Sequence, residues 1–220
     1  MVLEGQADAL VTGYTRSYPT VAKPMIELIG KVKGIRRVAA TNLMIGERGH
    51  LFLSDTAMNI NPNAKELVEI TRMTHTTMKL FGLEPTIAMV SFSNFGSTKS
   101  ESSTKIQEAV GYLHKYFPNI VVDGEFQADF ALNTKMRTDK FPFSKLEDKK
   151  VNALIYPNLE SANISYKLLK EMYKAESIGP IIMGLNKPVH LLQLGASVDE
   201  IVNMVCIAVV DAQERKKHNG

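Results

Sequence analysis

Short apolar runs alternate with helical stretches along this chain, and this alternation limits the possible folds more than any other feature. The runs 86–93, 120–123 and 151–156 have the length and composition of buried strands. Amphipathic stretches at 105–117 and 160–174 separate or follow these runs. This order predicts an α/β fold of the three-layer α/β/α type, with helices on both faces of a central sheet.

Turn and capping signals predict two further elements. The stretches 36–45 and 51–56 alternate around a glycine-containing turn, which predicts a β-hairpin. Asn63 and Glu66 have the spacing of a capping box, and the apolar spacing after them predicts a helix up to Phe81.

The amino-terminal stretch predicts a strand, a connection and a helix. Residues 5–13 contain the apolar run of a buried strand, 15–24 are polar enough for a connection, and 25–32 are amphipathic. Because a central parallel strand seldom opens a fold, we expect the natural polypeptide to continue upstream.

The stretch 178–200 contains two glycine turns in apolar surroundings. An apolar run at 180–183 and a second at 189–192 flank the first turn, and Ser197 and Glu200 form a capping box that starts a helix. Glycine turns of this kind expose backbone groups, which can bind a ligand with little steric hindrance.

The predicted last helix has almost no polar face between Ile201 and Val210. Such a helix should be covered on every side, either between subdomains or at a homodimer interface. Asn203 and Asp211 interrupt it and need partners, for which we expect backbone groups more than a ligand.

Composition excludes several classes of protein. The 220 residues are 45% hydrophobic and carry 26 basic and 23 acidic side chains, a mixed surface that argues against nucleic-acid binding. No apolar run is long enough for a membrane helix, and the one cysteine cannot form an intrachain disulfide, so we expect a cytoplasmic protein. The scattered histidines predict no metal site, and no nucleotide-binding glycine motif is present.

Five stretches together resemble the phosphate acetyltransferases over nearly the whole chain. The stretch 178–200 is similar to a G-P-x-x-x-G-x-x-K-P-x-x-x-L-S-R-G-x-S-x-x-D block of that family. The other stretches are 7–13 (A-D-A-L-V-T-G), 81–97, 122–132 and 156–168. The resemblance implies an isocitrate/isopropylmalate dehydrogenase-like fold of the phosphotransacetylase type, with a cleft between two subdomains. It implies one subdomain from 1–36 plus 177–220 and an inserted one from 37–176.

The family's reactive positions are altered here. Its Ser-Arg pair, which serves acetyl transfer, falls on Gln193 and Leu194, and its Asp falls on Glu200. Leucine lacks the charged, forked donor that binds a phosphate dianion, and glutamine has no ionisable group for proton transfer. The resemblance therefore implies a pocket that keeps coenzyme A and has lost the transfer chemistry. Glu200 is also explained by capping alone.

Several strings are more similar to the phosphotransacetylase-like half of multidomain NADP-dependent malic enzymes. They are 91–97 (S-F-S-N-F-G-S), 158–166, 187–192 and 201–212. In that family the domain is regulatory and responds to acetyl-CoA, with inhibition as the expected direction. NADP, a divalent metal and malate decarboxylation would belong to a catalytic domain of the same polypeptide outside this chain.

The resemblance and the polar loops together predict a set of acetyl-CoA contacts and no catalytic residue. These are Thr15, Arg16, Ser17, Lys23, Gly184, Leu185, Lys187, Pro188, Val189, His190, Gln193, Leu194, Glu200 and Ile207. Alone between apolar neighbours, His190 also fits an ordinary structural role.

Two alternatives stay open at this point. The chain could be an active phosphate acetyltransferase with unusual site residues. It could also be a scaffold that forms a homodimer or higher oligomer through its last helix and binds no ligand.

Overall fold

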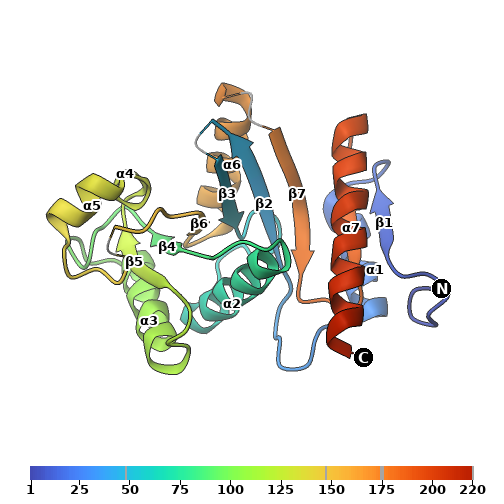
Figure 1. The fold of residues 1–220 in the computed structure, drawn as a ribbon, viewed down its shortest axis with the longest axis horizontal. Helices are drawn as coiled ribbons and strands as arrows, with labels where there is room; N and C mark the ends of the chain where they lie inside the picture. Colours follow the sequence, from blue (N-terminus) through green and yellow to red (C-terminus); the bar gives the residue numbers. More distant parts are fainter. Residues whose placement is uncertain (48, 147, 174–175, 220) are drawn as a thin grey trace.

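The computed structural model describes residues 1–47, 49–146, 148–173 and 176–219, and its strands form two sheets (Figure 1). The larger sheet has six strands in the order β5-β4-β6-β3-β2-β7, and the smaller sheet pairs β1 with β8. Helices flank the central sheet, so the mixed α/β architecture with a helix-covered sheet is confirmed.

The six-stranded sheet is parallel at its centre and antiparallel toward β7. Pairs β3–β6, β6–β4 and β4–β5 are parallel, whereas β2 is antiparallel to both β3 and β7. The strands are β2 (Ala39–Gly46), β3 (Gly49–Ser54), β4 (Ile87–Val90), β5 (Val122–Phe126), β6 (Ala153–Ile155) and β7 (Glu176–Met183). The predicted hairpin is confirmed as β2 and β3.

Two hydrophobic cores hold helices on opposite faces of this sheet. On one face α2 (Ala64–Leu80) and α3 (Glu101–Tyr116) pack through Leu67 and Ile106. On the other face α4 (Ala128–Leu132) and α6 (Leu159–Tyr173) pack through Ala131 and Tyr166. A short helix, α5 (Thr134–Lys140), follows α4.

The predicted capping box of α2 is confirmed. The backbone nitrogen of Glu66 donates to Asn63 Oδ1 at 3.0 Å, and the backbone nitrogen of Asn63 donates to Glu66 Oε2 at 2.9 Å. Two backbone donors that have no partner within the helix are thereby satisfied.

The amino-terminal stretch differs from the prediction. Strand β1 spans only Leu10–Gly13 and is half-buried, not buried. Helix α1 (Tyr18–Ile29) begins inside the stretch predicted as a polar connection. Proline in the first turn lacks only a backbone N–H that would have no helical partner there, so Pro19 is compatible with a helix start.

The small sheet is joined to the large one through β7. Strand β8 (Val189–Leu192) runs parallel to β1, with Leu10 opposite Val189 and Gly13 opposite Leu192. The expected subdomain boundary at residue 177 falls inside β7, which pairs along β2 from Ala39 to Ile45. A strand of the large sheet therefore leads directly into the small one.

Helix α7 (Val198–Asn219) is covered on one face only within this chain. Met204, Ile207 and Ala208 are buried, whereas Val202 and Val209 are 54% and 48% exposed. Within a single copy of the chain, β1, β7, β8 and α2 leave one side of this helix exposed, so the expected cover of that side by a partner copy stays a prediction. Within the described ranges, no helix is long and apolar enough to cross a membrane.

Gly13 provides a direct test of the β1–β8 pairing. Its φ is +110°, and a Cβ added there would lie 2.6 Å from the carbonyl oxygen of Leu192. We expect Gly13→Ala to lower the free energy of unfolding by about 2 to 4 kcal/mol, because backbone strain and a clash add together. Urea unfolding followed by circular dichroism measures it.

Gly34→Ala is the matched control. Gly34 also has a positive φ, +88°, but nothing lies within 4 Å of the added Cβ. We expect a loss of about 1 kcal/mol from the backbone conformation alone. Equal losses in the two variants would contradict the close approach of β1 to β8.

Candidate functional site

Most of the predicted ligand contacts fall into two groups near opposite ends of β8. The first group follows the ends of β1 and β8 and includes Arg16, Gln193 and Leu194. The second group precedes β8, in the turn that starts at Gly184. At about 3.3 Å per residue, the four residues of β8 hold the groups about 13 Å apart. One small chemical group therefore cannot contact both.

The first group forms what we call the carboxyl-end loops, residues 14–17 and 193–197. Because Gly13 and Leu192 are register partners in a parallel pair, both loops leave the same edge of the small sheet. Thr15, Arg16 and Ser17 are exposed, and Leu194 is 70% exposed. Loops at the carboxyl ends of parallel strands are where α/β proteins usually bind ligands.

Glu200 has two partners at the start of α7. Its Oε2 accepts from the backbone nitrogen of Ser197 at 2.8 Å, and Ser197 Oγ accepts from the backbone nitrogen of Glu200 at 3.2 Å, which confirms the predicted capping box. Its Oε1 lies 2.7 Å from Lys170 Nζ at the end of α6. Burial raises the pKa of Glu200, but Lys170 and Ser197 outweigh burial and hold it below its usual value.

Lys170 is a candidate site residue that the sequence analysis missed. Its pKa is raised mainly by the hydrogen bond to Glu200, so it stays charged beside the carboxyl-end loops. The two residues are 30 positions apart, and nothing in their local sequence indicates the contact. Asn203 makes a second contact of this kind, donating through Nδ2 to Glu176 Oε1 at 2.9 Å. The partner of Asn203 is thus a side-chain carboxylate, not the backbone group that we expected.

Tyr18, directly after the first loop, is also a missed candidate. Its hydroxyl group is buried and has no hydrogen-bond partner among the described residues. Burial, followed by the nearby charge of Asp55, raises the pKa of Tyr18. The Asp55 carboxylate accepts hydrogen bonds from the backbone nitrogens of Ala40, Ala57, Met58 and Asn59. Tyr18 thus follows the first loop in sequence, whereas its neutral hydroxyl group lies toward Asp55 at the end of β3.

Most of the second group is part of the hydrophobic core. Leu185 and Val189 are 1% exposed and pack with Ala22 and Ile29 of α1. Pro188 is buried, Lys187 is half-buried, and Lys23 is exposed on α1, away from this turn in sequence. The apolar part of this turn consequently packs against protein.

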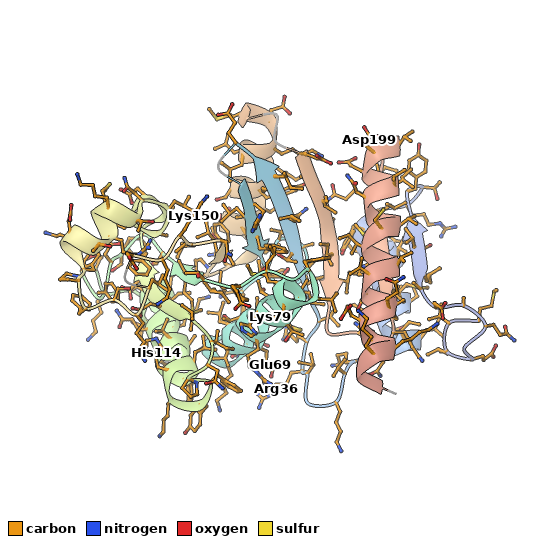
Figure 2. The ribbon with its side chains drawn as sticks, in the orientation of Figure 1. Arg36, Glu69, Lys79, His114, Lys150 and Asp199 are labelled. Carbon is orange, nitrogen blue, oxygen red and sulfur yellow. The ribbon has the colours of Figure 1, made fainter. Side chains whose placement is uncertain are left out.

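Gly184, His190 and Ile207 line a cavity of about 680 Å³. Its walls are the second half of α2, the end of β7 and the second half of α7, so we call it the α2–α7 cavity. In Figure 2, Lys79 marks the α2 wall, and Asp199 marks the other end of α7, where the carboxyl-end loops lie. The cavity and the loops are therefore separate features.

His190 and Asp211 form the polar part of the cavity wall. His190 is 1% exposed, and its Nε2 lies 3.3 Å from Asp211 Oδ2 without making a hydrogen bond of good geometry. Arg215 Nε donates to Asp211 Oδ1 at 2.6 Å. The partners of Asp211 are side chains, not the backbone groups that we expected. Burial raises the pKa of Asp211, but His190 and Arg215 outweigh burial and hold it below its usual value.

Gly184 has a structural reason to be glycine. Its φ is +90°, and a Cβ there would lie 2.8 Å from Met73 Sδ and 3.2 Å from Ile35 Cγ2. The glycine therefore lets the end of β7 approach α2, so a bulky substitution would strain the fold before it blocked any ligand.

The described part of the chain contains no group of three or more His, Cys, Asp or Glu residues placed to hold a metal. The features that remain as candidates are the carboxyl-end loops with their cations and the α2–α7 cavity.

The family model for phosphate acetyl/butaryl transferases matches residues 1–209. The chain belongs to this family. It is 40% identical, over 96% of its length, to an NADP-dependent malic enzyme of Haemophilus influenzae and spans 28% of that protein. It is 37% identical to a phosphate acetyltransferase of Clostridium acetobutylicum, again over 96% of its length, and spans 65% of that protein. The resemblance seen in the sequence is thereby confirmed.

Solved structures of this family have the same fold. A phosphotransacetylase from Streptococcus pyogenes superimposes with a TM-score of 0.90 at 36% identity, over 97% of this chain and 65% of that one. The match to the malic enzyme is only slightly higher in identity than the match to the transferase. Family membership therefore does not distinguish a regulatory domain from an active transferase. The site residues have to distinguish them.

The environment of Asp211 predicts a pH dependence of stability. Its folded-state pKa is lowered, so its contribution is complete above the unfolded value of about 3.9 and is lost as the pH falls through the folded value. We expect Asp211→Asn to lower the unfolding free energy most at pH 7, with the difference from wild type shrinking toward pH 3. Urea titrations from pH 7 to pH 3 measure it.

Asp139→Asn removes a carboxylate from the exposed side of α5 and serves as the control. We expect a change within about 0.5 kcal/mol at each pH. A wild-type advantage over Asp211→Asn that is as large at pH 3 as at pH 7 would contradict the account of Asp211.

Proposed function

We propose that this chain is a non-catalytic regulatory domain that binds acetyl-CoA at its carboxyl-end loops and controls a malic enzyme catalytic domain of the same cytoplasmic polypeptide. The observation that carries the proposal is the Gln193-Leu194 pair in the loop after β8. An exposed leucine stands where the family resemblance implies a guanidinium, and an amide stands where it implies a hydroxyl. Binding without acetyl transfer follows from that pair.

The loops retain groups that suit coenzyme A. Arg16 is exposed after β1, and Lys170 lies beside Glu200 at the start of α7, so two cations are available for the ligand's phosphates. Gln193 and Ser17 supply neutral hydrogen-bonding groups. An anionic phosphate competes with Glu200 for Lys170, which would couple ligand binding to the contact between α6 and α7.

Regulation requires that acetyl-CoA favours one arrangement of the protein over another. The Lys170–Glu200 and Asn203–Glu176 contacts join α7 to α6 and to β7, so a ligand at the loops acts on the position of α7. The exposed valines of α7 supply an apolar surface for a homodimer. We propose inhibition of the catalytic domain as the outcome.

An active phosphate acetyltransferase is the alternative function. It is favoured by the 37% identity to the clostridial enzyme and by Arg16, which leaves the same sheet edge as Gln193. In that case Arg16 would replace the missing guanidinium as the phosphate ligand. The two functions differ in whether acetyl-CoA is consumed.

Acetyl-CoA should bind the purified chain with a dissociation constant in or below the millimolar range, measured by isothermal titration calorimetry. We expect Arg16→Gln to weaken binding about tenfold, because a charge-assisted contact to a phosphate is worth about 1.4 kcal/mol. Arg36→Gln is the control, since Arg36 lies beside Glu69 of α2 (Figure 2). If the Arg16→Gln variant binds acetyl-CoA as tightly as the wild type, the carboxyl-end loops are not the acetyl-CoA site.

Acetyl phosphate should not form when the chain is incubated with acetyl-CoA and inorganic phosphate. We expect Leu194→Arg to bind inorganic phosphate more tightly without loss of stability, because residue 194 is exposed and the new side chain adds a guanidinium at the loops. A coupled assay for free coenzyme A measures turnover. Turnover by the wild type that is abolished in Arg16→Gln would establish the transferase instead.

A further inference from the structure

The α2–α7 cavity lies away from the carboxyl-end loops and has its own chemistry. We propose that it binds a second ligand, a small organic anion that carries a carboxylate or phosphate group on a short apolar body. The inference does not depend on acetyl-CoA binding and assigns a separate site to this chain.

The size and lining of the cavity suit a metabolite. Its volume of about 680 Å³ falls within the range of roughly 300 to 1,000 Å³ found for small-molecule sites. Phe81, Ile181 and Ile207 supply an apolar surface contributed by three different elements. Thr76 and Thr77 add hydroxyl groups on the α2 wall. The lining thus combines apolar contact with a few polar groups.

The charges around the cavity favour an anion. Four basic side chains line it against two acidic ones, a surplus of two positive charges. They are Lys33, Arg72, Lys79 and Arg215 against Asp211 and Glu214. Both carboxylates are paired, Asp211 with Arg215 and Glu214 with Lys217 outside the lining, and Lys79 is itself paired with Glu84 outside the lining. Lys33 forms no ion pair with any described residue, so its charge is available to a ligand.

Arg215 is held in position for binding. Its Nε and one terminal nitrogen donate to Asp211 at 2.6 and 3.4 Å, and its other terminal nitrogen donates to the carbonyl of Leu185 at 2.8 Å. Three of the five N–H groups are used in this way, so two remain. A guanidinium fixed by its own hydrogen bonds loses little conformational freedom when it binds a carboxylate or phosphate.

Benzoate, phenyl phosphate and the neutral benzamide are probes that separate charge from shape. We expect both anions to shift the methyl NMR signals of Ile181 and Ile207 saturably, and benzamide to bind at least tenfold more weakly. Ile60 and Ile164 are exposed elsewhere and should not move. A stronger effect of phenyl phosphate would indicate a phosphate ligand, and a stronger effect of benzoate a carboxylate.

Lys33→Gln tests the site without disturbing a described contact, and we expect it to weaken benzoate binding about three- to tenfold. Lys216→Gln is the matched control, because Lys216 lies next to Arg215 in sequence, pairs with Asp8 and does not line this cavity. Equal weakening by both variants, or equal binding of benzamide, would overturn the proposal.

Acetyl-CoA distinguishes this inference from the proposed function. We expect benzoate to bind whether or not acetyl-CoA is present, read from the methyl signal of Ile181 on β7, because α7 itself responds to acetyl-CoA in the proposed function. Displacement of benzoate by acetyl-CoA would show that the cavity is part of the acetyl-CoA site. It would overturn the proposal of a separate ligand site. Binding of benzoate without any binding of acetyl-CoA would support this inference while the proposed function failed.

Discussion

The antiparallel pairing of β7 with β2 is the constraint on which the rest of the structure depends. It makes β7 the last strand of the large sheet, and the turn at Gly184 then leads directly into β8 of the small sheet. The direction of β8 fixes the edge at which the carboxyl-end loops emerge. The same strand places α7 against α2 and so forms the walls of the cavity.

In the proposed function, binding and chemistry depend on different groups at the carboxyl-end loops. Under that proposal, affinity for acetyl-CoA comes from several cations and hydrogen-bonding groups at these loops, among them Arg16, Lys170 and Gln193. Acyl transfer to phosphate also needs groups that stabilise the reacting anion and move a proton, and a leucine–glutamine pair provides neither function. Replacement of two side chains can therefore leave a protein of the same fold that binds acetyl-CoA but does not transfer its acetyl group.

Local signals in the sequence predicted much of the fold. The capping boxes at Asn63 and Ser197 and the hairpin around Gly46 were predictable because the residues that define them are near neighbours. The start of α1 was missed because proline and polar residues occur equally in connections and in first helical turns. The exposed face of α7 was not predicted, because apolar residues indicate that a helix face is buried in the functional protein. They do not indicate whether the same chain or another one covers that face.

The site was predicted less completely, since its contacts join distant positions. Lys170 and Glu200 meet only because the end of α6 lies beside the start of α7, and no local pattern in the sequence indicates that contact. His190 and Asp211 are also distant in sequence, 21 positions apart. The Asp211–Arg215 pair was within reach, because a spacing of four residues places both on one helical face.

One NMR measurement tests the central claim most directly. Acetyl-CoA labelled with ¹³C at the thioester carbonyl is mixed with the chain and inorganic phosphate, and the carbonyl signal is followed over time. The account predicts a signal that shifts or broadens on binding and keeps its full intensity. Conversion of that signal into acetyl phosphate at an enzymatic rate would contradict the account.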